Sequence, residues 1–520
     1  MRRVSSAMTP LISVDRKAQR PLHRQIYDAY CASIVGGTLQ PGQRVPSTRG
    51  LALELGISRI PVLTAYAQLL AEGFFQSRVG TGTVVSTSLP DQALIPEPRR
   101  GTGRAVGSAA GKTPRHPSGA DPSQNVPWQR GWGAFGVGQV DFDQFPLAQW
   151  NSLVTRHCRG TNANYLDYCG AMGSKRLRES LAIYLRTSRG VSCDADQIMI
   201  VSGSQQALDL CVRVLLGAGS RVWMEEPGYR FARNVFDLNG CRVVPVPVDE
   251  QGLKVAVGIK RCRHARAVLV TPSHQYPLGF TMGASRRLQL LDWAEQTQSW
   301  ILEDDYDSEY RYESMPVSSL QGLDRNGRVV YIGTFSKVLF PSLRLGYVVI
   351  PSELVGRFRA VRSAMDISPP TFGQEVLADF IGEGHFSRHI RRMRLLYQQR
   401  RNALLESLHD VFGLKLELTG EQAGMHLCVM LNGIRDTEIA QRAADDKLWL
   451  TPLSTSYASK VVRQGFILGF ASTKAEEMPH AVRKLHAALG ARGGESHLTW
   501  QSSDSAHVLS RRFSHRPLMH

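Results

Sequence analysis

The residues best suited to chemistry are a lysine and its neighbours in the segment YIGTFSKVLFPSLRLGYVV. Lys337 follows a short apolar run typical of a β-strand, and Arg344 lies seven residues further along the chain. A lysine that forms a Schiff base with a carbonyl compound must be largely shielded from water and held in position. The apolar flanks and the nearby Gly333 and Gly346 permit such close packing, whereas an isolated Ser-Lys pair more often lies on a surface.

Two other segments supply groups that a Schiff-base cofactor, pyridoxal 5′-phosphate (PLP), requires. Its pyridine nitrogen is kept protonated by a buried carboxylate, and in WILEDDYDSEYRYE an apolar strand ends at Glu303-Asp304-Asp305. Its phosphate is held by backbone N–H groups, hydroxyls and a cation at a helix N-terminus. The segment VSGSQQALDL predicts a strand, a tight turn at Gly203-Ser204 and the start of a helix. Taken alone, the acidic run would more readily be a solvated loop, and the Gly-Ser turn could simply cap a helix. Together with Lys337, the set indicates PLP.

A second group of residues, near the N-terminus, could contact nucleic acid. Residues 1–90 contain ten Lys and Arg against four Asp and Glu, and the formal net charge of the whole chain is +17. An excess of positive charge favours an anionic partner. Arg44, Arg49 and Arg59 lie beside predicted turns, where they could reach phosphates or base edges. A helix that begins near Ser47 could also hold a phosphate at its N-terminus.

Three helices and a β-hairpin are predicted to position these N-terminal residues. The first helix covers 21–35, and Ser47 and Ser58 can cap the second and third, with Pro61 tolerated in the first turn of the third. The turn LGIS between them has the length that a helix-turn-helix needs. The segment FFQSRVGTGTVVS predicts a hairpin, which would complete a winged helix with its third helix in the major groove. A three-helix unit that merely packs or dimerises is the alternative. The residues expected at the hairpin tip are Gly80, Thr81 and Gly82.

The rest of the chain divides into a linker, a large domain and a tail. Residues 89–135 are rich in Pro, Gly, Ser and Ala, which predicts a flexible linker rather than a loop packed on a domain. Beyond it, β-rich runs alternate with helical patterns, which predicts βαβ units and a mostly parallel sheet that binds ligands at the carboxyl ends of its strands. We therefore predict a winged helix over 15–88, a PLP-binding α/β domain with a smaller C-terminal subdomain over 136–488, and a disordered tail over 489–520.

The composition narrows the class of protein. Hydrophobic residues make up 42% and charged residues 21% of the chain, which is ordinary for a globular protein. No apolar run approaches the roughly 18 residues that would cross a bilayer, and the start of the chain lacks the apolar stretch of a secretory signal. We expect a cytoplasmic protein. The eight cysteines form neither a CxxC pair nor a Cys/His cluster, so no disulfide framework and no metal site are expected.

The N-terminal segments GTLQPGQRVPSTRGLALELGISR and AYAQLLAEGFFQSRVGTGTVV resemble the GntR-type winged-helix domain of bacterial transcription regulators. The resemblance implies that double-stranded promoter DNA is a partner. It departs at Ile60-Pro61, which replaces the polar pair usual after Ser-Arg and puts base reading there in doubt. The residues that would contact DNA are Arg44, Ser47, Arg49, Ser58, Arg59, Gly80, Thr81 and Gly82.

From about Phe135 to Ala487 the chain resembles type I aminotransferases. That resemblance implies that Lys337 carries PLP as a Schiff base and that Asp304 pairs with the pyridinium nitrogen. It also implies that Tyr306 binds the phenolic oxygen of PLP and that Tyr229 stacks on the ring. The phosphate would be held by Ser204, Gln205, Thr334, Ser336 and Arg344.

Two positions depart from the aminotransferase pattern. Tyr276 stands at the cofactor site where an asparagine usually contacts the phenolic oxygen. Ile467 stands where many aminotransferases have the arginine that grips the substrate carboxylate. Arg230 or Arg233 could substitute for that arginine, although a solvated helix face is the simpler interpretation of both.

The order of the domains resembles the MocR/GabR family of PLP-dependent transcription regulators. The resemblance implies a homodimer in which PLP, or an amino acid or amine that reacts with it at Lys337, controls promoter binding. An aminotransferase with an accessory DNA-binding domain is the alternative function, and a cofactor-free dimerisation module is a third. The absence of an identifiable carboxylate-binding arginine favours the regulator.

Overall fold

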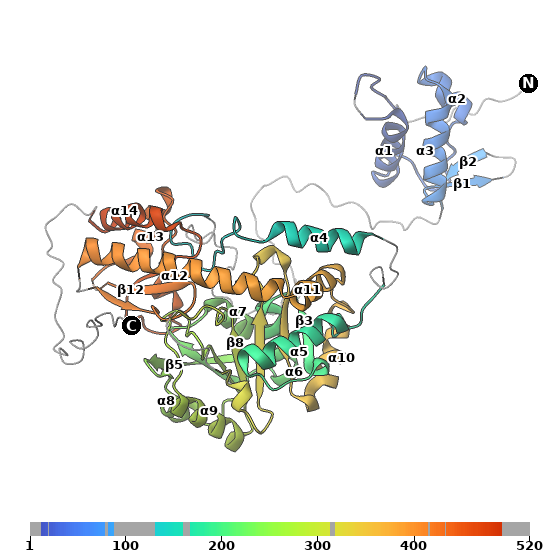
Figure 1. Cartoon of the computed structure of the whole chain (residues 1–520). Coiled ribbons are helices and arrows are strands. Elements are labelled where there is room, and N and C mark those ends of the chain that lie inside the picture. The colour runs from blue at the N-terminus through green and yellow to red at the C-terminus, as the bar shows by residue number, and fades with distance from the viewer. Residues whose placement is uncertain are drawn as a thin grey trace, which may run out of the picture. The chain divides into compact units, whose positions relative to one another are not determined.

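The computed structural model describes residues 12–18, 20–78, 82–87, 131–159, 167–312, 318–413, 416–431 and 433–490. They belong to two compact units, Met1–Gly111 and Lys112–His520 (Figure 1). Most of the predicted linker and nearly all of the predicted tail lie outside the described residues. No helix in the described ranges is both long enough and apolar enough to cross a membrane.

The N-terminal unit is the predicted winged helix. Its core joins the first helix, the third helix and the first strand through three aromatic rings, those of Tyr30, Tyr66 and Phe75, whose centroids lie 5.1 to 5.6 Å apart in edge-on contacts. The two tyrosine hydroxyls are 2.9 Å apart. Strands β1 and β2 pair antiparallel. The elements are α1 (Leu22–Val35), α2 (Thr48–Glu54), α3 (Arg59–Ala71), β1 (Phe75–Arg78) and β2 (Gly82–Val85).

The two predicted helix caps differ in the structure. The Ser47 hydroxyl accepts the backbone N–H of Gly50 at 3.1 Å, as expected of a cap. Ser58 occupies the same position before α3, but its side chain makes no capping hydrogen bond. A capping hydroxyl bonds the N–H of the second or third helical residue, and here the third is Pro61, which has none. The prediction of a side-chain cap at Ser58 was wrong, and Pro61 removes one of the two N–H groups that such a cap could have used.

The C-terminal unit is built on an eight-stranded sheet in the order β3-β10-β9-β8-β7-β4-β5-β6. Strands β9, β8, β7, β4 and β5 are parallel neighbours, and β10 is antiparallel to both β9 and β3. The carboxyl ends of β3 and β9 therefore lie at the same edge. The strands are β3 (Ile198–Val201), β4 (Arg221–Glu226), β5 (Arg242–Asp249), β6 (Gly252–Leu253), β7 (Ala267–Val270), β8 (Trp300–Asp305), β9 (Val329–Thr334) and β10 (Gly346–Val349).

Helices cover both faces of this sheet (Figure 1). Successive strand residues point to opposite faces, and accordingly Val222 packs in one apolar cluster with Phe236 and Phe358, while Trp223 packs in another with Trp293. Burial on both faces explains why the strands are continuously apolar. The helices of this part of the chain, not all of which lie on the sheet, are α4 (Leu147–Cys158), α5 (Lys175–Arg189), α6 (Ser204–Leu215), α7 (Arg230–Leu238), α8 (Val255–Cys262), α9 (Ala284–Thr297), α10 (Val355–Asp366) and α11 (Phe372–Gly382).

The smaller subdomain joins the long helix α12 (His385–Phe412) to a four-stranded antiparallel sheet in the order β11-β12-β14-β13. Despite its many arginines, α12 buries Met393, Tyr397, Leu404 and Leu408 in the main apolar cluster. It is therefore an amphipathic helix of the core. The other elements are β11 (Glu417–Thr419), β12 (His426–Met430), α13 (Asp436–Asp445), β13 (Thr451–Pro452), β14 (Gly465–Gly469) and α14 (Met478–Gly490).

Candidate functional site

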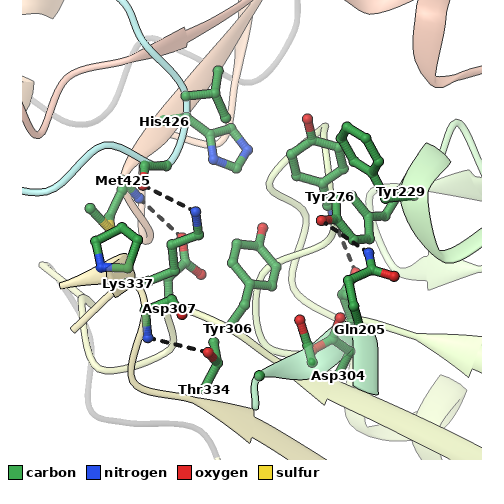
Figure 2. Close-up of a pocket in the computed structure, with 18 of the residues that line it drawn as sticks. Gln205, Tyr229, Tyr276, Asp304, Tyr306, Asp307, Thr334, Lys337, Met425 and His426 are labelled. Atoms are coloured by element: carbon green, nitrogen blue, oxygen red, sulfur yellow. Dashed lines mark hydrogen bonds between the residues drawn. The ribbon is translucent and has the colours of Figure 1, made fainter. Parts of the chain in front are cut away.

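A cavity of about 480 Å³ opens at the carboxyl edge of the large sheet (Figure 2). Residues that follow β3, β4, β8 and β9 converge there with the small sheet, which is the place where sheets of this kind bind ligands. The cavity brings together all ten cofactor-site residues expected from the sequence. They are Ser204, Gln205, Tyr229, Tyr276, Asp304, Tyr306, Thr334, Ser336, Lys337 and Arg344.

Lys337 follows β9 and points into the cavity (Figure 2). Its Nζ donates a hydrogen bond to the carbonyl oxygen of Gly138 at 3.0 Å. Burial lowers the pKa of the Lys337 amine below its ordinary value, and the negative charge of Asp307 opposes this effect. A lowered pKa raises the fraction of unprotonated amine, which is the form that attacks a carbonyl.

Gly138 is a contact that the sequence did not reveal. Its φ is +72°, in the left-handed region, and a Cβ at this position would lie 2.3 Å from Lys337 Nζ. Any residue larger than glycine at position 138 would therefore clash with the Lys337 side chain in its present position. Gly138 lies 199 positions from Lys337 in the sequence, so no local sequence pattern around the lysine could have predicted this contact.

Asp304 lies at the end of β8 with its side chain buried. Burial, followed by the charges of Asp305 and Glu225, raises the pKa of the Asp304 carboxyl to about 7. Its Oδ1 has no hydrogen-bond partner among the described residues. An orphaned, buried carboxylate oxygen is costly unless a donor meets it, and the protonated nitrogen of PLP is such a donor. The residues present therefore fit PLP.

A second group of residues in the cavity wall suits a phosphate. Gly203 caps α6 with φ +103°, so Ser204 and Gln205 open the helix at the cavity wall. The Arg344 guanidinium lies 3.6 Å from the position that a Cβ on Gly203 would take. The Thr334 hydroxyl accepts the N–H of Ser336 at 3.2 Å and so fixes the turn before the lysine. A helix N-terminus with hydroxyls and a guanidinium is a general phosphate-binding arrangement.

Aromatic residues form the remaining wall. The rings of Tyr229 and Tyr276 meet edge-on with centroids 5.5 Å apart, and Gln205 Nε2 donates to the Tyr229 hydroxyl at 3.5 Å. Burial raises the pKa of both tyrosines, so both hydroxyls stay neutral. Tyr306 lies between Asp304 and Lys337 in the view of Figure 2, and its hydroxyl donates to the carbonyl oxygen of His274 at 3.0 Å.

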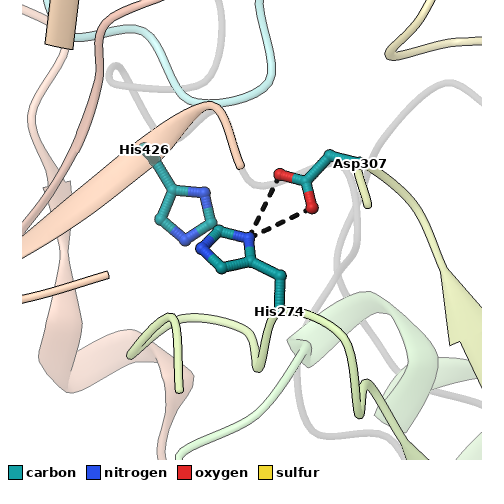
Figure 3. A group of neighbouring side chains, drawn as sticks. All are labelled: His274, Asp307 and His426. Carbon is teal, nitrogen blue, oxygen red and sulfur yellow. Dashed lines mark hydrogen bonds and ion pairs between the residues drawn. The ribbon is translucent and has the colours of Figure 1, made fainter. Parts of the chain in front are cut away.

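A buried group of polar residues, His274, Asp307 and His426, was not anticipated from the sequence (Figure 3). The Asp307 carboxylate accepts His274 Nδ1–H at 3.1 Å and the backbone N–H of Met425 at 3.1 Å. His426 Nε2 donates to the carbonyl oxygen of Pro277 at 3.2 Å, and burial holds the pKa of this imidazole well below its ordinary value, so it is neutral. One potential ligand atom from each of His274, Asp307 and His426 lies within 4.8 Å of the others. These contacts hold a negative charge near Lys337.

Within the described part of the chain, the structure provides no substitute arginine near Ile467, the position where many aminotransferases bind the substrate carboxylate. Its side chain is fully buried in β14, among apolar residues. Arg233 donates to the backbone oxygens of Tyr457 and Ser456, and Arg230 lies over the Phe231 ring at 5.3 Å. Neither arginine lines the cavity, where the only Lys or Arg among the described lining residues are Lys337 and Arg344.

The expected DNA-contacting residues surround the helix-turn-helix. Arg44, Ser47, Arg49, Ser58 and Arg59 are all exposed. Arg59 Nε donates to the Thr48 hydroxyl at 3.2 Å, which ties the start of α3 to the start of α2. The backbone of Arg44 bridges to Val84, and its side chain lies beside Gly82 at the start of β2. The other two residues expected at the hairpin tip, Gly80 and Thr81, lie outside the described residues.

Comparison with known proteins matches both units. Residues 132–485 match the family model "Aminotransferase class I and II", and residues 22–85 match "Bacterial regulatory proteins, gntR family". The chain is 38% identical to the probable rhizopine catabolism regulatory protein MocR of Rhizobium meliloti, over 92% of this chain and 96% of that protein. It is 34% identical to the uncharacterized HTH-type transcriptional regulator YdeL of Bacillus subtilis (strain 168), over 92% of this chain and 99% of that protein. Its structure resembles the kynurenine aminotransferase of Pyrococcus horikoshii in complex with PMP, with a TM-score of 0.64 and 30% identity over 68% of this chain and 89% of that chain.

Proposed function

Because this chain belongs to the class I and II aminotransferase family and, through its gntR-family domain and its relatives, to the MocR-type regulators, we propose that it is a PLP-dependent transcription regulator. The winged helix over residues 15–88 binds promoter DNA, and the domain over 136–488 holds PLP. The protein acts in the cytoplasm as a homodimer, in which two winged helices meet two half-sites of one operator.

One observation supports sensing over turnover. The cavity brings together the ten residues expected to bind the cofactor, with Tyr276 in place of the usual asparagine, yet Ile467 is buried where an aminotransferase would present a guanidinium to its substrate. A carboxylate and a guanidinium form paired, charge-assisted hydrogen bonds that position a substrate for reaction. The chain would therefore hold the reactive cofactor but lacks, at this position, the arginine that binds the substrate carboxylate in efficient transamination of amino acids.

Different residues of the cavity would have different roles in binding PLP and in sensing an effector. When bound, PLP supplies a carbonyl that amines can attack and a ring that accepts electrons. Asp304 keeps the ring nitrogen protonated, Arg344 and the start of α6 hold the phosphate, and Lys337 offers the amine with which an effector competes. An effector can change DNA binding only if it binds two conformations of the dimer unequally.

The test combines DNA binding with product analysis on the full chain. A pool of randomised DNA duplexes is selected for binding to the PLP-loaded protein, and the protein is then mixed with an α-amino acid, an ω-amino acid and a simple alkylamine. A regulator gives enriched duplexes and a change of its visible spectrum with one of the amines, without continued release of a keto acid or aldehyde. Sustained conversion to the pyridoxamine form with release of a keto acid over many turnovers would favour the aminotransferase. A chain that takes up no PLP at all would favour a cofactor-free dimerisation module.

A further inference from the structure

The solvent-facing side of helix α3 is apolar, which is unusual for a helix in a strongly basic domain. Ile60 is 73% exposed and Leu63 is 42% exposed, and Thr64 and Ala67 are exposed as well. Their spacing of three and four residues places them on one face of the helix. Single exposed apolar residues are common on protein surfaces, but here four exposed positions with apolar groups share one face, which we call the α3 stripe.

The α3 stripe is not a part of the domain core. The opposite face of the helix makes the core contacts, with Val62, Ala65, Tyr66 and Leu69 buried against α1, α2 and β1. Within the stripe, the Thr64 hydroxyl donates to the backbone oxygen of Ile60 at 3.1 Å. That bond occupies the polar end of the Thr64 side chain, so the methyl group is what it can offer to a partner.

Charged residues near the stripe indicate an anionic partner. Arg49 in the first turn of α2 and Arg59 at the start of α3 are both exposed, and the hydrogen bond from Arg59 to Thr48 brings the starts of the two helices together. An apolar strip with guanidinium groups beside it matches the major groove of DNA, where phosphates form the edges and thymine methyl groups lie on the floor. In a helix-turn-helix, the first turns of the second helix reach the base edges, and Ile60 and Leu63 lie in those turns.

We infer that the α3 stripe reads thymine methyl groups in the operator, with Ile60 and Leu63 making the apolar contacts that select T·A base pairs. This inference rests on the proposed function and adds to it the kind of base that is recognised. Arg49 and Arg59 supply affinity through phosphates, whereas the stripe supplies sequence preference.

The experiment uses the full chain and duplexes selected from a randomised pool. Each thymine of the best duplex is replaced in turn by deoxyuridine, which lacks only the C5 methyl group, and affinity is measured by fluorescence anisotropy at constant salt. At one or two positions in each half-site, the replacement should weaken binding about fourfold, the effect of burying one methyl group. Replacement elsewhere in the duplex should have no effect.

Two variants and one control assign the effect to the stripe. For each of Ile60→Ala and Leu63→Ala, there should be one thymine position at which replacement by deoxyuridine no longer changes the affinity. Leu53→Ala removes a side chain that is 85% exposed on α2, outside the stripe, and should keep the fourfold difference. All three side chains are exposed, so the variants should fold.

The outcomes separate the inference from the proposed function. If no duplex is enriched, the chain does not bind DNA specifically and both fail. If duplexes are enriched but deoxyuridine binds as tightly as thymine everywhere, or if Ile60→Ala keeps the difference, the methyl-reading role is overturned. If the alanine variants instead turn a dimer into a monomer in sedimentation and leave base preference unchanged, the stripe is a contact between copies of the chain and the inference is overturned.

Discussion

Replacing Asp304 with asparagine should stabilise the cofactor-free protein at neutral and alkaline pH and, at the same time, weaken its binding of PLP. In the absence of the cofactor, the Asp304 carboxyl is buried beside Asp305 and Glu225, and its Oδ1 has no partner among the described residues. These surroundings disfavour the charged form. An amide of nearly the same shape carries no charge.

The size and pH range of the effect follow from the pKa. The ordinary pKa of an aspartate is 3.8, and in the folded chain that of Asp304 is raised to about 7. Between these values the folded protein holds a proton that the unfolded chain releases, so stability falls as the pH rises from about 4 to about 7 and stays low above it. At 1.36 kcal/mol per pKa unit the loss is at most about 4 kcal/mol. Asp304→Asn should therefore gain up to about 4 kcal/mol at pH 8 and nothing at pH 4.

The assay is urea unfolding of the PLP-stripped protein and of Asp304→Asn at pH 4, 6 and 8, followed by a PLP titration of both. Glu303→Gln is the matched control for PLP binding. Burial raises the pKa of Glu303 to about 7 as well, but its carboxylate accepts the N–H groups of Leu320 and Gln321, away from the cavity. A stability difference that does not change with pH, or PLP binding by Asp304→Asn as tight as in the wild type, would refute the assignment.

The other predictions concern the lysine, its glycine neighbour and the DNA-binding arginines. Lys337→Ala should remove the visible absorption band of lysine-bound PLP and leave the circular dichroism spectrum unchanged; a persistent band would mean that another lysine holds the cofactor. Gly138→Ala should weaken PLP binding about tenfold, because of its φ of +72° and the 2.3 Å approach to Lys337 Nζ. Since burial lowers the pKa of Lys337 below 10.5, the rate of PLP uptake in stopped-flow mixing should rise with pH and level off before pH 10.5. Arg49→Ala and Arg59→Ala should each make the negative slope of log affinity against log salt less steep by about one. Unchanged slopes would mean that these arginines do not contact DNA phosphates.

Local sequence patterns predicted the elements and the cavity well for physical reasons. The carboxyl ends of parallel strands lie at one edge of the sheet, independently of the loops that connect them. Reactive residues near those ends, such as Asp304 in β8 and Lys337 after β9, therefore lie at the same edge. The helix start at the cavity wall was foreseeable because a glycine turn between a strand and a helix presents backbone N–H groups.

The features that local patterns missed depend on contacts between distant segments. The neighbour of Lys337, Gly138, comes from the segment before α4, and His426 comes from the small subdomain. Asp307 stands within a visible acidic run, but only its contacts with His274 and Met425 separate it from the carboxylates around it. The missing side-chain cap at Ser58 had one sign in the sequence, because Pro61 lacks one of the two N–H groups that such a cap can bind.

In the proposed function, PLP chemistry at Lys337 controls DNA binding. The most direct test measures the affinity of a selected operator duplex for the PLP-stripped protein, the PLP-loaded protein and Lys337→Ala mixed with PLP, all at one salt concentration. We expect PLP, or PLP with one amine of the panel, to change the affinity of the wild type at least fivefold and to leave that of Lys337→Ala unchanged. A coupling free energy of about 1 kcal/mol corresponds to about fivefold. Equal affinities for the stripped and loaded wild type, with every amine tested, would contradict this expectation.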